Sequence, residues 1–84
     1  MRVMVAEHAL KHGLSEADIR YAWKNYIRMQ QRPAPKEEYV AAVGYTRTGV
    51  LIQMVAIAVE DGHLVIHAMA PLTNKVLKEL GMAR

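Results

Sequence analysis

The chain contains four histidines, His8, His12, His63 and His67, and no cysteine. Imidazole titrates near neutral pH, so a histidine can take up or release a proton during a reaction. His67 lies near the end of a predicted strand, and we expect it to be the residue best suited to act as a general acid or base. The favoured interpretation is nevertheless a half-buried histidine that is hydrogen-bonded to a neighbour.

His8 and His12 lie four residues apart, a spacing that can bind a metal ion on one face of a helix. The residues between them, Ala9-Leu10-Lys11, lack the glutamate of a HExxH zinc site. Helix-terminal histidines are the favoured interpretation of this pair. The sequence also lacks a paired-carboxylate site, a phosphate-binding glycine loop and a Ser/His/Asp constellation. We therefore expect no metal and no other cofactor.

Positive charge is concentrated in the N-terminal part of the chain. Residues 1–36 have a formal charge of +4, whereas residues 37–84 have a charge of −1. Arg20, Lys24 and Arg28 recur every four residues along and just beyond the second predicted helix, where they form a basic stripe. Two interpretations remain open: a solvated face in which Glu16 pairs with Arg20, or a surface that contacts the phosphates of RNA.

Two helices are predicted before the strands, and they would carry several of these side chains. Val3 to His12 has apolar residues at helical spacing and is followed by Gly13, which suits a left-handed helix cap. The second helix, Ser15 to Tyr26, begins with a stronger signal. The side chain of Ser15 can accept a hydrogen bond from the backbone N–H of Asp18.

The middle of the chain is rich in residues that favour strands. The predicted strands are Tyr39 to Tyr45, Val50 to Val59 and His63 to Met69, preceded by a short strand at Ile27 to Gln31. Gly49 and the Asp61-Gly62 pair supply the hairpin turns. Pro71 stops the sheet, and Leu72 to Leu80 closes the chain as a short helix. The expected fold is a single α+β domain over residues 1–84, with two N-terminal helices and an antiparallel meander of three to four strands.

A two-residue Asp61-Gly62 turn would divide the sheet into two apolar faces. It pairs Ile57 with Ile66 on a face of large side chains. It places His67 opposite Ala56 on a face of small ones, the small-residue face. This face is either covered by a helix or forms a cleft for a substrate or partner, and helix packing is the favoured interpretation.

Two segments of the chain resemble small BrnT-like toxins of the RelE superfamily, which belong to bacterial type II toxin–antitoxin pairs. Lys11-His12-Gly13-Leu14-Ser15-Glu16-Ala17-Asp18-Ile19 is similar to the family's Lys-His-Gly helix junction. Asp61-Gly62 followed by Val65-Ile66-His67-Ala68-Met69 is similar to the family's last strand, which ends with residues of the active cleft. Family members usually have an arginine just after this strand, where the present chain has Ala70-Pro71.

The resemblance implies a ribonuclease that cuts RNA without a metal, by general acid–base catalysis and electrostatic stabilisation of the phosphate. It makes Lys11, His12, Arg47 and His67 the candidate catalytic residues and Lys75 a further phosphate contact. The stripe of Arg20, Lys24 and Arg28 would add further contacts to RNA. An antitoxin protein is the expected partner.

A different class of function is also consistent with the sequence. The chain can be a non-catalytic module that binds a partner protein, or forms a homo-oligomer, through the small-residue face and its methionines. No apolar run approaches the roughly 20 residues of a membrane span, and the N-terminal residues lack a signal-peptide pattern. We expect a cytoplasmic protein without membrane contacts.

Overall fold

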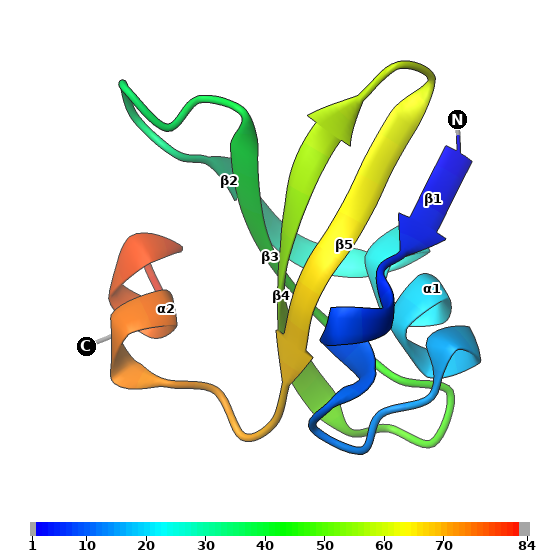
Figure 1. Cartoon of the computed structure of the whole chain (residues 1–84). Coiled ribbons are helices and arrows are strands. Elements are labelled where there is room, and N and C mark those ends of the chain that lie inside the picture. Colours follow the sequence, from blue (N-terminus) through cyan, green and yellow to red (C-terminus); the bar gives the residue numbers. More distant parts are fainter. Residues whose placement is uncertain (1, 83–84) are drawn as a thin grey trace.

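A computed structural model describes residues 2–82 of the chain and shows a single mixed sheet with helices on both faces (Figure 1). The elements are β1 Arg2–Val5, the 3-10 helix η1 Glu7–Leu10, α1 Glu16–Lys24, β2 Tyr26–Gln31, β3 Tyr39–Tyr45, β4 Leu51–Val59, β5 Gly62–Met69 and α2 Asn74–Glu79. The five strands follow the order β1-β5-β4-β3-β2. β1 and β5 are parallel, and the other neighbours are antiparallel. The α+β class is confirmed, although the arrangement differs in detail from the predicted one.

The first segment of the chain is a strand rather than a helix. β1 pairs in parallel with β5, and the backbone N–H of Arg2 donates to the carbonyl of Asp61 at 2.7 Å. The β-branched side chains of Val3 and Val5 suit an extended backbone, and this non-local pairing overrides the helical spacing of the apolar residues. The prediction of a helix from Val3 to His12 is therefore wrong, and only the short η1 lies within that span.

α1 lies within the helix predicted from the Ser15 cap. The Oγ of Ser15 accepts a hydrogen bond from the backbone N–H of Asp18 at 3.1 Å. The buried side chains of the helix pack on the sheet, and they are Ile19, Ala22 and Trp23. Burial of one large apolar side chain is worth about 1.5–3 kcal/mol, so this face holds the helix in place. The helix stops at Lys24 and β2 begins at Tyr26, where the sequence predicted the helix to end.

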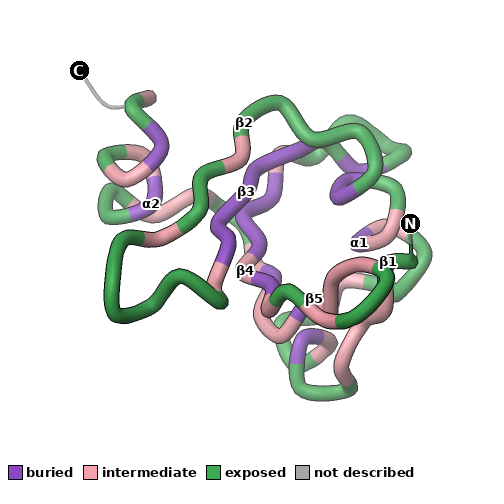
Figure 2. Tube along the Cα trace, turned by 90° about the horizontal axis from the view of Figure 1, so that it is seen from above, coloured by how far each residue is buried: buried purple, intermediate pink, exposed green. Residues whose placement is uncertain are grey.

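The sheet separates two cores of unequal size. The larger core lies between the sheet, α1 and η1, and its fully buried members include Ile52, Met54 and Ala56. The smaller core lies under α2 and consists of Ala41, Val43, Val76 and Leu80. In Figure 2 the buried stretches of β3 and β4 lie between α2 on one side and α1 on the other. Helix packing on the small-residue face, the favoured of the two interpretations, is thus confirmed.

The turn between β4 and β5 is one residue earlier than predicted. It consists of Glu60 and Asp61, and Val59 lies opposite Gly62, which already belongs to β5. Asp61 has a positive φ of 70°. Gly62 serves the close approach of β1, because a Cβ at this position would overlap the backbone of Arg2. The prediction of an Asp61-Gly62 turn is therefore wrong, and the glycine has a different structural role.

A β-bulge in β5 changes the face on which His67 lies. Ala56 pairs with Val65, whereas Val55, the next residue back along β4, pairs with His67. Ile66 is the extra residue of the bulge, which shifts the alternation of side chains by one position. His67 therefore shares the face of Val55 and α2. The prediction that His67 lies on the small-residue face is wrong.

α2 covers only part of its side of the sheet. The backbone N–H of Thr73, the residue that caps the helix, donates to the side-chain oxygen of buried Gln53 at 2.7 Å. α2 is shorter than the predicted helix from Leu72 to Leu80. Beyond it lie partly exposed apolar side chains of β4 and β5, which we call the open apolar face: Val55, Ile57, Val59, Leu64 and Ile66. No helix within residues 2–82 is long and apolar enough to cross a membrane.

We predict that Gly62→Ala destabilises the protein by about 3 kcal/mol, because the new Cβ forces β1 away from β5. The matched control is Gly49→Ala. Gly49 has a φ of 88° but no atom within 4 Å of the added Cβ, so only the backbone conformation is penalised, by about 1 kcal/mol. Urea unfolding followed by circular dichroism measures both values. Equal losses in the two variants would show that β1 is not tightly held at Gly62.

Candidate functional site

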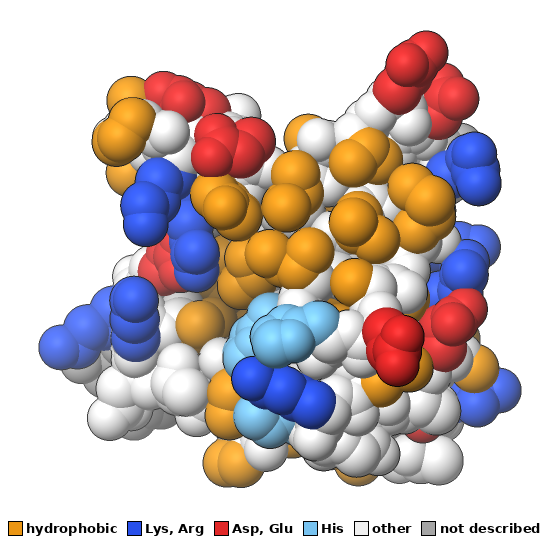
Figure 3. Space-filling model, viewed as in Figure 1, with side chains coloured by type: hydrophobic (Ala, Val, Ile, Leu, Met, Phe, Trp, Pro, Cys, Tyr) orange, Lys and Arg blue, Asp and Glu red, His pale blue; other side chains and the backbone are white. Residues whose placement is uncertain are grey.

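His12 and His67 lie side by side although they come from distant parts of the chain. Their ring centroids are 5.4 Å apart and the ring planes meet at 78°, an edge-to-face arrangement. His67 is half-buried, and His12 and its neighbour Lys11 are exposed. Figure 3 shows histidine side chains gathered with a cationic side chain at the border of an apolar surface. We call His12, His67 and Lys11 the imidazole cluster.

The pairing of β1 with β5 determines where His12 lies. The last backbone hydrogen bond between these segments runs from the N–H of Ala6 to the carbonyl of Val65, at 2.9 Å. This bond lies directly before the bulge in β5. Beyond the bulge, β5 is contacted by η1 rather than by β1. The residues that follow η1, Lys11 and His12, thereby reach His67.

The surroundings of His67 favour its neutral form. Burial lowers the pKa of His67 below its ordinary value of 6.5, and the positive charges of His12, Lys11, His8 and Arg32 lower the pKa further. Both causes act against the imidazolium ion. At neutral pH the ring of His67 is therefore uncharged and has a nitrogen that can accept a proton.

An uncharged imidazole beside a second imidazole and an ammonium group can act on a phosphodiester. One ring can remove a proton from a hydroxyl group while the other donates a proton to the departing oxygen. The ammonium group of Lys11 can stabilise negative charge on the phosphate. Within residues 2–82, no three His, Cys, Asp or Glu side chains are placed to hold a metal ion.

Arg47, the fourth candidate catalytic residue, is engaged elsewhere. Its Nε donates to Oδ1 of Asp18 at 3.1 Å and so ties the loop between β3 and β4 to α1. The hydrogen bond from Arg47, followed by the one with Ser15, lowers the pKa of the Asp18 carboxyl. The structure thus joins three of the four candidate catalytic residues and leaves Arg47 apart.

The predicted basic stripe is split between two elements. Arg20 and Lys24 lie on α1, and Arg20 pairs with Glu16 at 2.8 Å, as the solvated-face interpretation expects. Arg28 lies on β2, because the chain has already left the helix, and it donates to the carbonyl of Leu80 at 3.3 Å. Arg28 is thus bonded to the end of the α2 segment, whereas Arg20 and Lys24 lie on α1.

Lys75 lies on α2, which shares a face of the sheet with His67. Arg32 lies beside Lys75 and donates to Glu79 at 2.7 Å. Arg32 also acts on the pKa of His67, and reasoning from the sequence missed it. Arg32 lies between the end of β2 and Pro33 and belongs to no sequence motif. Only the pairing of β2 with β3 brings it to the side of the sheet that α2 covers.

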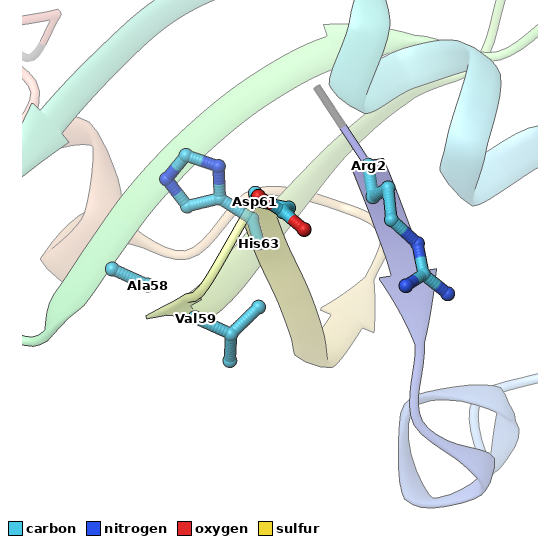
Figure 4. A pocket seen from close by; sticks show the side chains of 6 residues that line it. Arg2, Ala58, Val59, Asp61 and His63 are labelled. Atoms are coloured by element: carbon cyan, nitrogen blue, oxygen red, sulfur yellow. The ribbon is translucent and has the colours of Figure 1, made fainter.

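His63 belongs to a separate part of the molecule. Its ring lies 5.2 Å from the ring of Trp23, and it pairs with Ala58 on the side of the sheet that α1 covers. Its Nδ1 is buried and has no hydrogen-bond partner among residues 2–82. Figure 4 shows it beside the pocket at the turn between β4 and β5, together with Asp61 and with Arg2 of β1. The sheet lies between His63 and the imidazole cluster.

Comparison of the chain with protein-family models, curated proteins and solved structures gave no match. The functional inference therefore depends on the arrangement of side chains in this molecule. The closest arrangement to a reaction centre among those described is the imidazole cluster, in which proton-transfer groups and positive charge meet beside an apolar surface.

We predict that the ring of His67 titrates with a midpoint below 6.5 in an NMR pH titration. His12→Gln should raise this midpoint more than His8→Gln does, because His12 exerts the larger charge effect. Added salt should raise the midpoint only partly, since salt screens the neighbouring charges but does not reverse burial. A midpoint at or above 6.5 in the native protein would contradict the described environment.

Stability should follow the same proton equilibrium. The pKa of His67 is lower in the folded state than in the unfolded state, so the unfolded chain binds more protons in the window just below pH 6.5. Stability contributed by His67 is therefore present above this window and is lost as the pH falls through it. His67→Gln should remove this part of the pH dependence of the urea midpoint.

Proposed function

We propose that the protein is the toxin of a bacterial type II toxin–antitoxin pair and acts as a metal-independent endoribonuclease. The observation that carries this proposal is the contact between the rings of His12 and His67, whose centroids lie 5.4 Å apart. The two residues belong to the two segments that resemble BrnT-like toxins, and they meet only through the fold. Lys11, from the first of these segments, supplies positive charge to the same cluster.

In the proposed reaction, the neutral ring of His67 removes the proton from a ribose 2′-hydroxyl group. The 2′-oxygen forms a bond to the adjacent phosphorus, and the bond from phosphorus to the 5′-oxygen of the next nucleotide breaks. His12, in its imidazolium form, donates a proton to that 5′-oxygen. Lys11 stabilises the negative charge that builds up on the phosphate oxygens. The products are a 2′,3′-cyclic phosphate and a 5′-hydroxyl end.

The open apolar face supports a protein partner, whichever chemistry the protein performs. Its partly exposed side chains are shown in Figure 3 as a continuous apolar surface beside the histidines. Contiguous apolar surfaces of this kind often mark interaction sites. An antitoxin bound there would cover the approach to the imidazole cluster and thereby inhibit the enzyme.

The alternative function is a non-catalytic module that binds a partner protein or a second copy of the chain. The small-residue face is filled by α1, so such a module would use the open apolar face instead. This alternative assigns no catalytic role to His12 and His67. Substitution of these histidines by glutamine therefore separates the two functions.

We predict that purified protein cleaves single-stranded RNA in the presence of EDTA and that His67→Gln and His12→Gln each lower the rate by about 10²–10⁴-fold. The matched control is His63→Gln, on the other side of the sheet, which should retain the native rate. The rate is measured with end-labelled RNA, and the 2′,3′-cyclic phosphate ends are identified by mass spectrometry.

Growth of a bacterial host provides a second readout. Induced expression of the native chain should arrest growth, and His12→Gln or His67→Gln should relieve the arrest. If induction leaves growth and cellular RNA intact, the ribonuclease proposal fails and the interaction module is favoured. If the arrest persists in both histidine variants, the assignment of the catalytic residues is wrong.

A further inference from the structure

A basic cleft opens between α2 and the loop that joins β2 to β3. Its volume is about 470 Å³, and its lining consists of Arg32, Lys36, Lys75, Lys78 and Glu79. We call it the basic cleft. Four cations and one carboxylate leave an excess of three positive charges, equal to the formal net charge of +3 of the whole chain. Such a concentration of charge in a hollow attracts polyanions.

The ion pair between Arg32 and Glu79 holds the two walls of the basic cleft together. Two nitrogens of the guanidinium donate to the two carboxylate oxygens, at 2.7 and 3.2 Å. The side chains of Arg32 and Glu79 are only 24% and 19% exposed, so the pair is partly shielded from solvent. Because Glu79 balances the charge of Arg32, the excess of positive charge resides on the lysines.

The three lysines of the basic cleft are available to a ligand. Lys36, Lys75 and Lys78 are exposed and form no ion pair with any acidic side chain of residues 2–82. Lys75 and Lys78 are three residues apart in α2 and therefore project from the same side of the helix. Lys36 approaches from the loop. Ammonium groups from two elements thus converge, an arrangement that suits phosphate oxygens.

The basic cleft and the imidazole cluster lie on the same side of the sheet. Arg32 donates its backbone N–H to the carbonyl of Tyr39, which pairs with Ile57 of the open apolar face. The charge of Arg32 also contributes to the low pKa of His67. Tyr39 and Ile57 are both partly exposed and pair on this side of the sheet, where unstacked bases can rest on them.

We propose that the basic cleft binds the phosphodiester backbone of a single-stranded RNA whose scissile phosphate lies at the imidazole cluster. This inference rests on the proposed ribonuclease function and identifies the surface that binds the RNA beyond the scissile phosphate. A single strand is favoured over a duplex because its bases are free to lie on the apolar surface between the two sites. The RNA contacts are thereby assigned to Lys36, Lys75 and Lys78 rather than to Arg20, Lys24 and Arg28.

The test uses the full chain and a short single-stranded RNA in which every 2′-oxygen is methylated, so that the 2′-oxygen cannot attack the phosphate. Its affinity is measured by fluorescence anisotropy over a range of salt concentrations. For single strands the slope of log K against log salt changes by about 0.7 for each phosphate contact. Lys36→Gln, Lys75→Gln and Lys78→Gln should each reduce the slope by about 0.7, and the Lys75→Gln/Lys78→Gln double variant by about 1.4.

Two matched variants control for charge and position. Arg2→Gln removes one exposed positive charge from β1, far from the basic cleft in the order of the sheet, and should leave the slope unchanged. Lys75→Arg/Lys78→Arg keeps the charges and should retain the slope of the native protein. Circular dichroism of each variant verifies that it folds.

The outcomes distinguish this inference from the proposed function. If unmodified RNA is cleaved but the lysine variants bind with the native slope, the basic cleft does not hold the substrate and the inference is overturned. The same conclusion follows if Arg2→Gln reduces the slope as much as Lys78→Gln. If the slopes fall as expected but no RNA is cleaved, the basic cleft is an RNA-binding site and the catalytic proposal alone fails.

Discussion

The parallel ladder between β1 and β5 is the interaction on which the arrangement of the candidate site depends. It extends from Arg2 to Val5 and is closed by the hydrogen bond between Ala6 and Val65. Because β1 is so short, half of the outer edge of β5 remains uncovered, and η1 occupies that edge. The segment that follows η1 then passes the end of β5, and His12 in this segment lies against His67 of β5.

The two faces of the sheet differ in how completely they are buried. The face under α1 and η1 is packed with fully buried side chains, so it supplies most of the apolar burial that opposes the entropy of the unfolded chain. The face under α2 contains a smaller core and leaves much of β4 and β5 accessible. The imidazole cluster and the basic cleft both belong to this second face. A ligand can therefore bind there without disturbing the larger core.

Predictions from the sequence were correct where neighbouring residues determine the structure, and wrong where contacts between distant segments determine it. The cap at Ser15 and the strand at Tyr39–Tyr45 follow from neighbouring residues, and both are present. β1 was not predicted because it is only four residues long and its apolar residues also fit the spacing of a helix. Only the pairing with β5 makes this segment a strand. His67, which the sequence singled out, lies beside His12 in the structure. It was predicted on the wrong face, because the bulge at Ile66 contains no glycine that would indicate it. No motif or spacing in the sequence indicated that Arg32 lies near the candidate site.

The bulge at Ile66 makes the local regularity of β5 as important as the identity of its residues. In a regular strand Ile66 would pair with Val55, and each later residue would move to the opposite face, so that His67 would turn beneath η1 and Ala68 would face α2. Two chains of this fold with equally long β5 strands, one with the bulge and one without it, would then present different side chains at the same point in space. Comparison of such chains by sequence alignment alone would equate positions that occupy opposite faces. Within this fold, a bulge can move a candidate-site side chain to the other face without any substitution.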